Sequence, residues 1–133
     1  MSAIAIDTHV LLWYILDPGQ LSQPAHDVLS RAEQDGDPVY VSVISLVEIR
    51  YLVEKGRIVQ TALQLVENGL NQVDSPLVLV LLDLAVTQAL GQVSRTAVPD
   101  MPDRIIAATA LHLDVPLVTR DAAIRAAPIM TIW

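Results

Sequence analysis

Short aliphatic runs alternate with segments of helical spacing along the whole chain, and this alternation constrains the fold more than any other feature. The period and the β-branched content of the runs predict strands at residues 3–6, 39–41, 77–81, 116–119 and 129–132. We interpret residues 77–81 as a buried strand, since all five side chains are aliphatic. Strands that alternate with helices are typical of βαβ units. The predicted fold is therefore α/β, a three-layer sandwich with a central, mainly parallel sheet of four to five strands flanked by helices.

The predicted helices lie between these strands and are bounded by recognisable caps and breakers. Helical spacing occurs near residues 8–16, 22–31, 42–56, 59–70, 85–93, 103–113 and 121–126. Ser42 or Ser45 is expected to cap the third helix. Asp103 is expected to begin the sixth, after a proline-containing loop at residues 98–102. No repeat or linker interrupts the pattern, so we expect a single domain over residues 1–133.

Composition excludes several classes of protein. The chain has no cysteine, which excludes a disulfide scaffold and thiolate metal sites. With 53% hydrophobic and 17% charged residues, it does not match a disordered chain. The apolar run at residues 10–16 is far shorter than the ~20 residues that a membrane-spanning helix needs. No leader is expected at the N-terminus, and the cytoplasm is the expected location.

The net charge of −7, from 15 acidic and 8 basic residues, would ordinarily argue against binding to nucleic acid. The argument fails if several acids meet in one pocket and hold a divalent cation, because the cation inverts the local charge. Three acids stand at or near the carboxyl ends of predicted strands or at helix starts: Asp7, Asp103 and Asp121. Glu48 interrupts an otherwise apolar helix. Taken singly, each Asp is explained as readily by helix capping as by a functional role, and Glu48 is explained as readily by exposure to solvent.

Four segments that contain these acids resemble the PIN-domain ribonucleases, and most of all the VapC toxins of bacterial toxin–antitoxin pairs. They are IDTHVLLW (6–13), SVISLVEI (42–49), DMPDRIIAATAL (100–111) and PLVTRD (116–121). The resemblance implies a PIN-like fold and a metal-dependent endoribonuclease that cleaves RNA phosphodiesters. It also implies neutralisation by a cognate VapB-like antitoxin, whose C-terminal segment lies across the acidic site, and a homodimer.

The functional residues implied by the resemblance are an acidic quartet with two auxiliary groups. The quartet of catalytic residues and metal ligands is Asp7, Glu48, Asp103 and Asp121. Asp100 is an auxiliary acid and Thr119 a hydroxyl contact. Mg²⁺ or Mn²⁺ is the expected cofactor, because hard cations prefer carboxylate and water oxygens. Two departures from the family pattern are a proline one place later, between Asp100 and Asp103, and Val47 where an aromatic residue is usual.

Basic and aromatic residues near these segments have competing interpretations. We consider Arg50, Arg104 and Arg120 as contacts to RNA phosphates, although each is more ordinarily a surface charge. His9 is interpreted as an ordinary residue rather than a metal ligand, because magnesium sites seldom use imidazole. Trp13 and Tyr14 are interpreted as core and interface residues rather than base-stacking platforms.

Two other functions remain open at this point. A phosphoacceptor receiver domain also places acids at strand ends, but it needs a lysine near the last strands, and the one lysine is Lys55. A catalytically inactive PIN-like binding scaffold would be separated from an enzyme by an RNA cleavage assay. The helices near residues 22–33 and 46–70 carry many apolar residues, which we take as candidates for dimer and antitoxin surfaces: Leu46, Ile49, Tyr51, Leu52, Ile58, Val59, Leu63, Leu65 and Val66.

Overall fold

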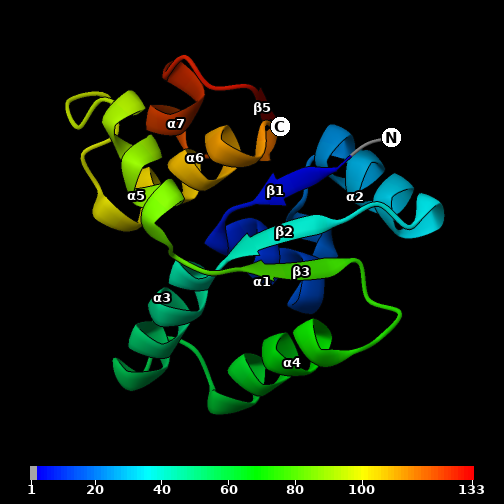
Figure 1. Cartoon of the computed structure of the whole chain (residues 1–133). Helices are drawn as coiled ribbons and strands as arrows, with labels where there is room; N and C mark the ends of the chain where they lie inside the picture. Colours follow the sequence, from blue (N-terminus) through cyan, green and yellow to red (C-terminus); the bar gives the residue numbers. More distant parts are fainter. Residues whose placement is uncertain (1–2) are drawn as a thin grey trace.

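Within residues 3–133, the sheet at the centre of the molecule has five strands, all parallel, in the order β3-β2-β1-β4-β5. The computed structural model describes residues 3–133. Its strands are β1 (Ile4–Ile6), β2 (Val39–Ser42), β3 (Leu77–Val80), β4 (Leu117–Val118) and β5 (Thr131–Ile132). The prediction of a parallel sheet flanked by helices is confirmed (Figure 1). The last strand is two residues shorter than predicted.

Seven α-helices connect and cover the strands within the described residues. They are α1 (Thr8–Leu16), α2 (Gln23–Asp35), α3 (Val43–Glu54), α4 (Gln60–Asn71), α5 (Leu84–Ala89), α6 (Met101–Leu113) and α7 (Ala122–Ala126). Short 3₁₀ turns follow α1 and α5, at Pro18–Gln20 and Leu90–Gln92. Among residues 3–133 no helix combines the length and the apolar character needed to cross a bilayer.

Alternating side chains of the strands divide the core into two layers. Ile4 and Ile6 of β1 belong to one buried cluster with α1, α2 and α4, whereas Ala5 belongs to the other with α5, α6 and α7. Figure 1 shows α5, α6 and α7 on one side of the sheet and α4 on the other. Helix α3 serves both layers, since Ile49 packs in the first cluster and Ile44 in the second. The period-2 geometry of a strand produces this division directly.

Two of the helix boundaries that differ from the prediction have a clear local cause. Helix α6 begins at Met101 rather than Asp103, because Asp100 is the N-cap and its Oδ1 accepts a hydrogen bond from the Asp103 backbone N–H (3.1 Å). Pro102 fits the first turn, where its missing N–H leaves no helical bond unmade. Helix α2 runs to Asp35, four residues beyond the predicted end, and stops where Gly36 adopts a left-handed conformation (φ 71°).

Burial also corrects two predictions about apolar residues. Strand β3 is not a buried strand: Val78 and Leu79 are 41% and 38% exposed, because β3 is at the sheet edge, where β2 is its one neighbour among residues 3–133. Three residues of the proposed dimer and antitoxin surface lie in the core instead, namely Ile49, Leu63 and Val66. They occupy the inward faces of α3 and α4. Because both faces of these helices carry apolar residues, composition alone does not show which face is buried.

The strand order creates a crevice at the carboxyl ends of β1 and β4. The chain starts at β1 in the centre, adds β2 and β3 on one side, and then returns to add β4 and β5 on the other. In open parallel sheets, the loops leave such a reversal point in opposite directions and expose a crevice there. Asp7 directly follows β1 and Thr119 directly follows β4, so both residues lie at this crevice.

Candidate active site

Asp7 is a buried carboxylate held by hydrogen bonds from two directions. Its Oδ1 accepts from the Val10 backbone N–H (2.9 Å), which caps α1, and its Oδ2 accepts from Thr119 Oγ1 (2.5 Å). Thr119 is completely buried, and its Oγ1 also accepts from the Asp121 backbone N–H (3.0 Å). Burial raises the pKa of Asp7 above its usual value, although both hydrogen bonds act in the opposite direction. The end of β1 is thereby fixed to the end of β4.

Glu48 reaches the same crevice from α3. Its Oε1 accepts from Thr8 Oγ1 (2.5 Å), and Thr8 Oγ1 lies 2.9 Å from Ser45 Oγ. Ser45 and Thr8 are both buried, so this hydroxyl pair fixes the Glu48 carboxylate against α1. Burial raises the pKa of Glu48, and the nearby Asp100 raises it further. Thr8 belongs to the D-T-H segment and Ser45 to the S-x-x-E segment. Their places next to Asp7 and before Glu48 are the sequence features that could have indicated both hydroxyl groups.

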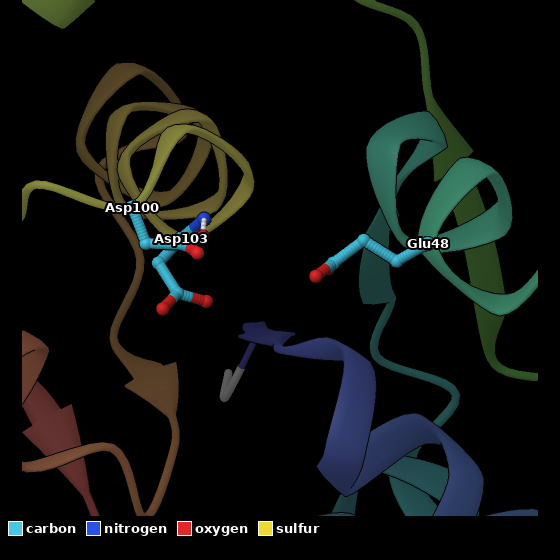
Figure 2. Close-up of side chains that lie close together, drawn as sticks. All are labelled: Glu48, Asp100 and Asp103. Atoms are coloured by element: carbon cyan, nitrogen blue, oxygen red, sulfur yellow. Dashed lines mark hydrogen bonds between the residues drawn. The ribbon is translucent and has the colours of Figure 1, made fainter. Parts of the chain in front are cut away.

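Asp100 and Asp103 approach Glu48 from the first turn of α6. Figure 2 shows the Glu48 side chain extending from α3 toward these two acids at the start of α6. One carboxylate oxygen of each of the three residues lies within 4.8 Å of those of the other two. Burial, together with repulsion by Asp100, Asp121, Glu48 and Asp7, raises the pKa of Asp103 from 3.8 to about 7. Asp100, expected as an auxiliary acid, therefore belongs to the same group of three carboxylates as Glu48 and Asp103.

All five of these acids line one pocket of about 390 Å³. Its lining residues are Asp7, Thr8, His9, Trp13, Glu48, Asp100, Asp103, Arg120 and Asp121. Asp121 also caps α7 by accepting from the Ile124 backbone N–H (2.9 Å), so the same residue both caps a helix and lines the pocket. Thr119 lies behind Asp7 and does not line the pocket. The structure thus brings the predicted quartet and Asp100 together.

A hard divalent cation fits this donor set. The ligand atoms of Glu48, Asp100 and Asp103 are all carboxylate oxygens, and none of these three groups forms an ion pair among residues 3–133. A cation between them would offset the repulsion that, after burial, contributes to the raised pKa of Asp103. All three members of this group are carboxylates, the ligand type that Mg²⁺ prefers. His9 lines the pocket but lies outside the group.

Of the three arginines considered for RNA, only Arg120 lines the pocket. Arg104 donates from Nε to the Val93 carbonyl (2.8 Å) and from Nη2 to the Leu90 carbonyl (2.8 Å), which attaches α6 to the turn that follows α5. Arg50 lies 4.0 Å from Glu67 on α4. Arg104 and Arg50 therefore have structural contacts outside the pocket, and their role in RNA binding stays a prediction.

Trp13 has a position that the sequence interpretation missed. It packs against the core, as expected, but it also lines the acidic pocket together with His9. The i, i+4 spacing of these residues on α1, starting two positions after Asp7, was the signal that could have placed both of them at the site. Tyr14 lies elsewhere, where its hydroxyl donates to Glu33 of α2.

The chain resembles proteins of one family in both sequence and structure. The PIN domain family model matches residues 4–129. Ribonuclease VapC22 of Mycobacterium tuberculosis (strain ATCC 25618 / H37Rv) is 30% identical over 125 residues, which cover 94% of this chain and 92% of that protein. The fold is similar to VapBC2 from Rickettsia felis bound to a promoter DNA fragment (TM-score 0.73, 18% identity, 97% and 96% covered). It is also similar to DNA-bound VapBC from Salmonella typhimurium (TM-score 0.70, 20% identity, 98% and 97% covered).

Proposed function

Since the chain belongs to the PIN-domain family, we propose that it is a metal-dependent endoribonuclease that acts in the cytoplasm as the toxin of a toxin–antitoxin pair. The observation that carries the proposal is the convergence of five acids from four segments on one pocket at the crevice of the sheet. A fold gains nothing from bringing like charges together, so the arrangement is explained best by a cation and a phosphate substrate. The similarity to a protein named as a ribonuclease supports the same reaction.

Mg²⁺ or Mn²⁺ is the proposed cofactor, with Glu48, Asp100 and Asp103 as its nearest ligands and Asp7 and Asp121 as the remaining acids of the site. When bound, such a cation lowers the pKa of water and stabilises the negative charge that builds on the phosphate oxygens. Asp7 is oriented for this task by the Thr119 hydroxyl and the Val10 N–H. Glu48 is oriented by the Thr8 hydroxyl.

The proposed partners are a VapB-like antitoxin and a second copy of the chain. Exposed apolar side chains on α3 and α4 support a protein partner, since Tyr51, Val59 and Leu65 are 60%, 69% and 50% exposed. Val47 is exposed as well, and it immediately precedes Glu48, which lines the acidic pocket. Two of the solved structures with a similar fold are of VapBC. A partner on α3 would therefore lie next to the acidic pocket.

The alternative functions meet specific obstacles. A receiver domain needs a lysine at the acidic pocket, and Lys55 instead forms the C-cap of α3 and does not line that pocket. An inactive scaffold has no need for the hydroxyl contacts that hold the Asp7 and Glu48 carboxylates at one pocket. RNA cleavage distinguishes the scaffold from the enzyme.

The decisive experiment is cleavage of single-stranded RNA by the purified chain without antitoxin. We expect cleavage in Mg²⁺ or Mn²⁺ by the unmodified chain and a loss of several orders of magnitude in the Asp7→Asn variant. Asp83→Asn is a matched control, because Asp83 caps α5 in the same way (Oδ1 to the Val86 N–H, 3.0 Å) but lies outside the acidic pocket. Equal activity in the Asp7→Asn and Asp83→Asn variants would exclude the proposed mechanism.

A further inference from the structure

One wall of the acidic pocket is aromatic and cationic. It is formed by α1 and by the turn between β4 and α7, which supply His9, Trp13 and Arg120. The centroids of the His9 and Trp13 rings are 5.7 Å apart at an interplanar angle of 42°. The Arg120 guanidinium lies over the Trp13 ring, with Cζ 5.0 Å from its centroid. These three residues, which we call the aromatic wall, face the same space as the five acids.

Arg120 is unpaired although it lines a pocket with five carboxylates. Among residues 3–133, no acidic oxygen lies within 4.0 Å of its guanidinium. The carboxylates nearest to it in sequence and topology have other donors: Asp121 accepts from the Ile124 N–H, and Asp7 accepts from Thr119 and Val10. Arg120 is exposed and is held by its stack on Trp13. A free cation on this wall remains available to an anion that enters the pocket.

The Trp13 ring is itself supported from within the molecule. It packs against the first core cluster, and its centroid lies 5.8 Å from that of Trp133. Stacking on this rigid indole restricts the guanidinium before any ligand binds. The stacked Arg120 therefore loses less side-chain entropy on binding than an unrestricted arginine would. His9, by contrast, is exposed, and it lines the acidic pocket beside Trp13.

We propose that the aromatic wall is a nucleotide subsite, in which Arg120 binds the phosphate next to the scissile one and the His9 ring stacks on the adjoining unpaired base. The proposal rests on the proposed ribonuclease function. Single-stranded RNA is bound in general through bases stacked on aromatic or guanidinium planes and through phosphates contacted by arginine. The aromatic wall supplies both kinds of group, and the five acids, once they hold a cation, supply a place for the scissile phosphate.

The phosphate contact is tested by RNA affinity in the full chain made inactive by Glu48→Gln. The probe is a fluorescently labelled single-stranded RNA in Mg²⁺, followed by anisotropy. Loss of a charge-assisted hydrogen bond should raise the Kd of the Arg120→Gln variant roughly 10-fold. The matched control is Arg125→Gln, because Arg125 is an exposed arginine five residues away that does not line the pocket. Arg120→Lys keeps the charge but loses the planar stack on Trp13, so its affinity should fall between the other two.

The base contact is tested with RNA that lacks one base. An abasic ribose beside the cleavage site should raise the KM of the active chain roughly 5-fold or more, as expected for the loss of one stacked base. The His9→Ala variant should lose this sensitivity, since it has no ring on which the base can stack. His26→Ala provides the control, because His26 is an exposed histidine on α2, away from the pocket.

The outcomes separate the subsite from the enzymatic function. Metal-dependent cleavage by the unmodified chain, together with equal Kd values for Arg120→Gln and Arg125→Gln, would overturn the phosphate contact and leave the ribonuclease intact. If the abasic RNA raised the KM of the His9→Ala variant as much as that of the unmodified chain, the base contact would be overturned in the same way. If Arg120→Gln weakens binding of a purified protein partner but not of RNA, the wall binds a partner's carboxylate and the subsite proposal is wrong. A chain that neither binds nor cleaves single-stranded RNA overturns both proposals.

Discussion

Replacing Asp103 with asparagine should stabilise the metal-free protein while abolishing cleavage. Asp103 sits in the first turn of α6, but Asp100 is the N-cap, so Asp103→Asn leaves the cap intact. Burial and four neighbouring acids raise the pKa of Asp103 from 3.8 to about 7. This rise in pKa corresponds to a loss of folding free energy of at most ~4 kcal/mol, and we expect ~2 kcal/mol after solvent screening of this partly exposed group.

The pH dependence follows from proton linkage. Well below pH 3.8, Asp103 is protonated in both the folded and the unfolded state, so the unmodified chain and Asp103→Asn should have similar stability. Between pH 4 and pH 7 the unfolded chain releases this proton while the folded chain keeps it, so the stability of the unmodified chain falls as the pH rises. Above pH 7, Asp103 is ionised in both states and the difference in stability reaches its full value, so Asp103→Asn should be more stable than the unmodified chain by ~2 kcal/mol.

The assay is urea unfolding in EDTA at several values between pH 4 and pH 8, with the same series repeated in Mg²⁺. In Mg²⁺ the advantage of Asp103→Asn should shrink or reverse, because the variant has lost a ligand that favours the folded, metal-bound state. Asp83→Asn is the control: it replaces an exposed cap outside the pocket, and asparagine caps about as well as aspartate. An Asp103→Asn variant that unfolds like the unmodified chain at pH 8, cuts RNA normally and shows an unchanged Mg²⁺ effect would refute the reasoning.

Three further predictions concern the metal, the support of Asp7 and the antitoxin. Cleavage should stop in EDTA, return with Mg²⁺ or Mn²⁺ and ignore zinc-selective chelators; full cleavage in EDTA would exclude a carboxylate–metal site. Thr119→Val should lower both cleavage and the free energy of unfolding, the latter by ~1–3 kcal/mol, because Asp7 Oδ2 loses a buried donor, whereas Thr119→Ser should keep both. Urea unfolding measures this difference, and equal stability of the two variants would count against it. Saturating cognate antitoxin should inhibit RNA cleavage competitively in steady-state kinetics, and unchanged cleavage would show that it binds away from the pocket.

Local patterns were sufficient to predict the elements and most of the acids. The alternation of aliphatic runs and helical segments predicts the parallel sheet, because strand and helix periodicities are short-range properties of the chain. Asp7 and Asp121 end or follow strands, and the carboxyl ends of parallel strands share one edge of the sheet, so their proximity could be expected. Glu48 stood out as an acid in an apolar helix, but periodicity alone cannot distinguish such a site residue from a solvated one, and the resemblance assigned it to the site.

Other features depended on contacts between segments far apart in the chain. Strand order determines that β3 is an edge strand, so the exposure of Val78 could not be inferred from its aliphatic neighbours. Whether Arg104 is available to RNA depends on two carbonyls near the end of α5, which hold its guanidinium.

The pocket shows the same division between sequence and structure. The sequence alone determined which groups can ionise and which segments carry them. Only the tertiary structure decided that Glu48 lies within 4.8 Å of two acids on α6, and that Trp13 carries a free arginine into the same pocket. The physical reason is that electrostatic repulsion, burial and stacking act over a few ångströms of space, whereas sequence patterns specify only neighbours along a single helix or strand.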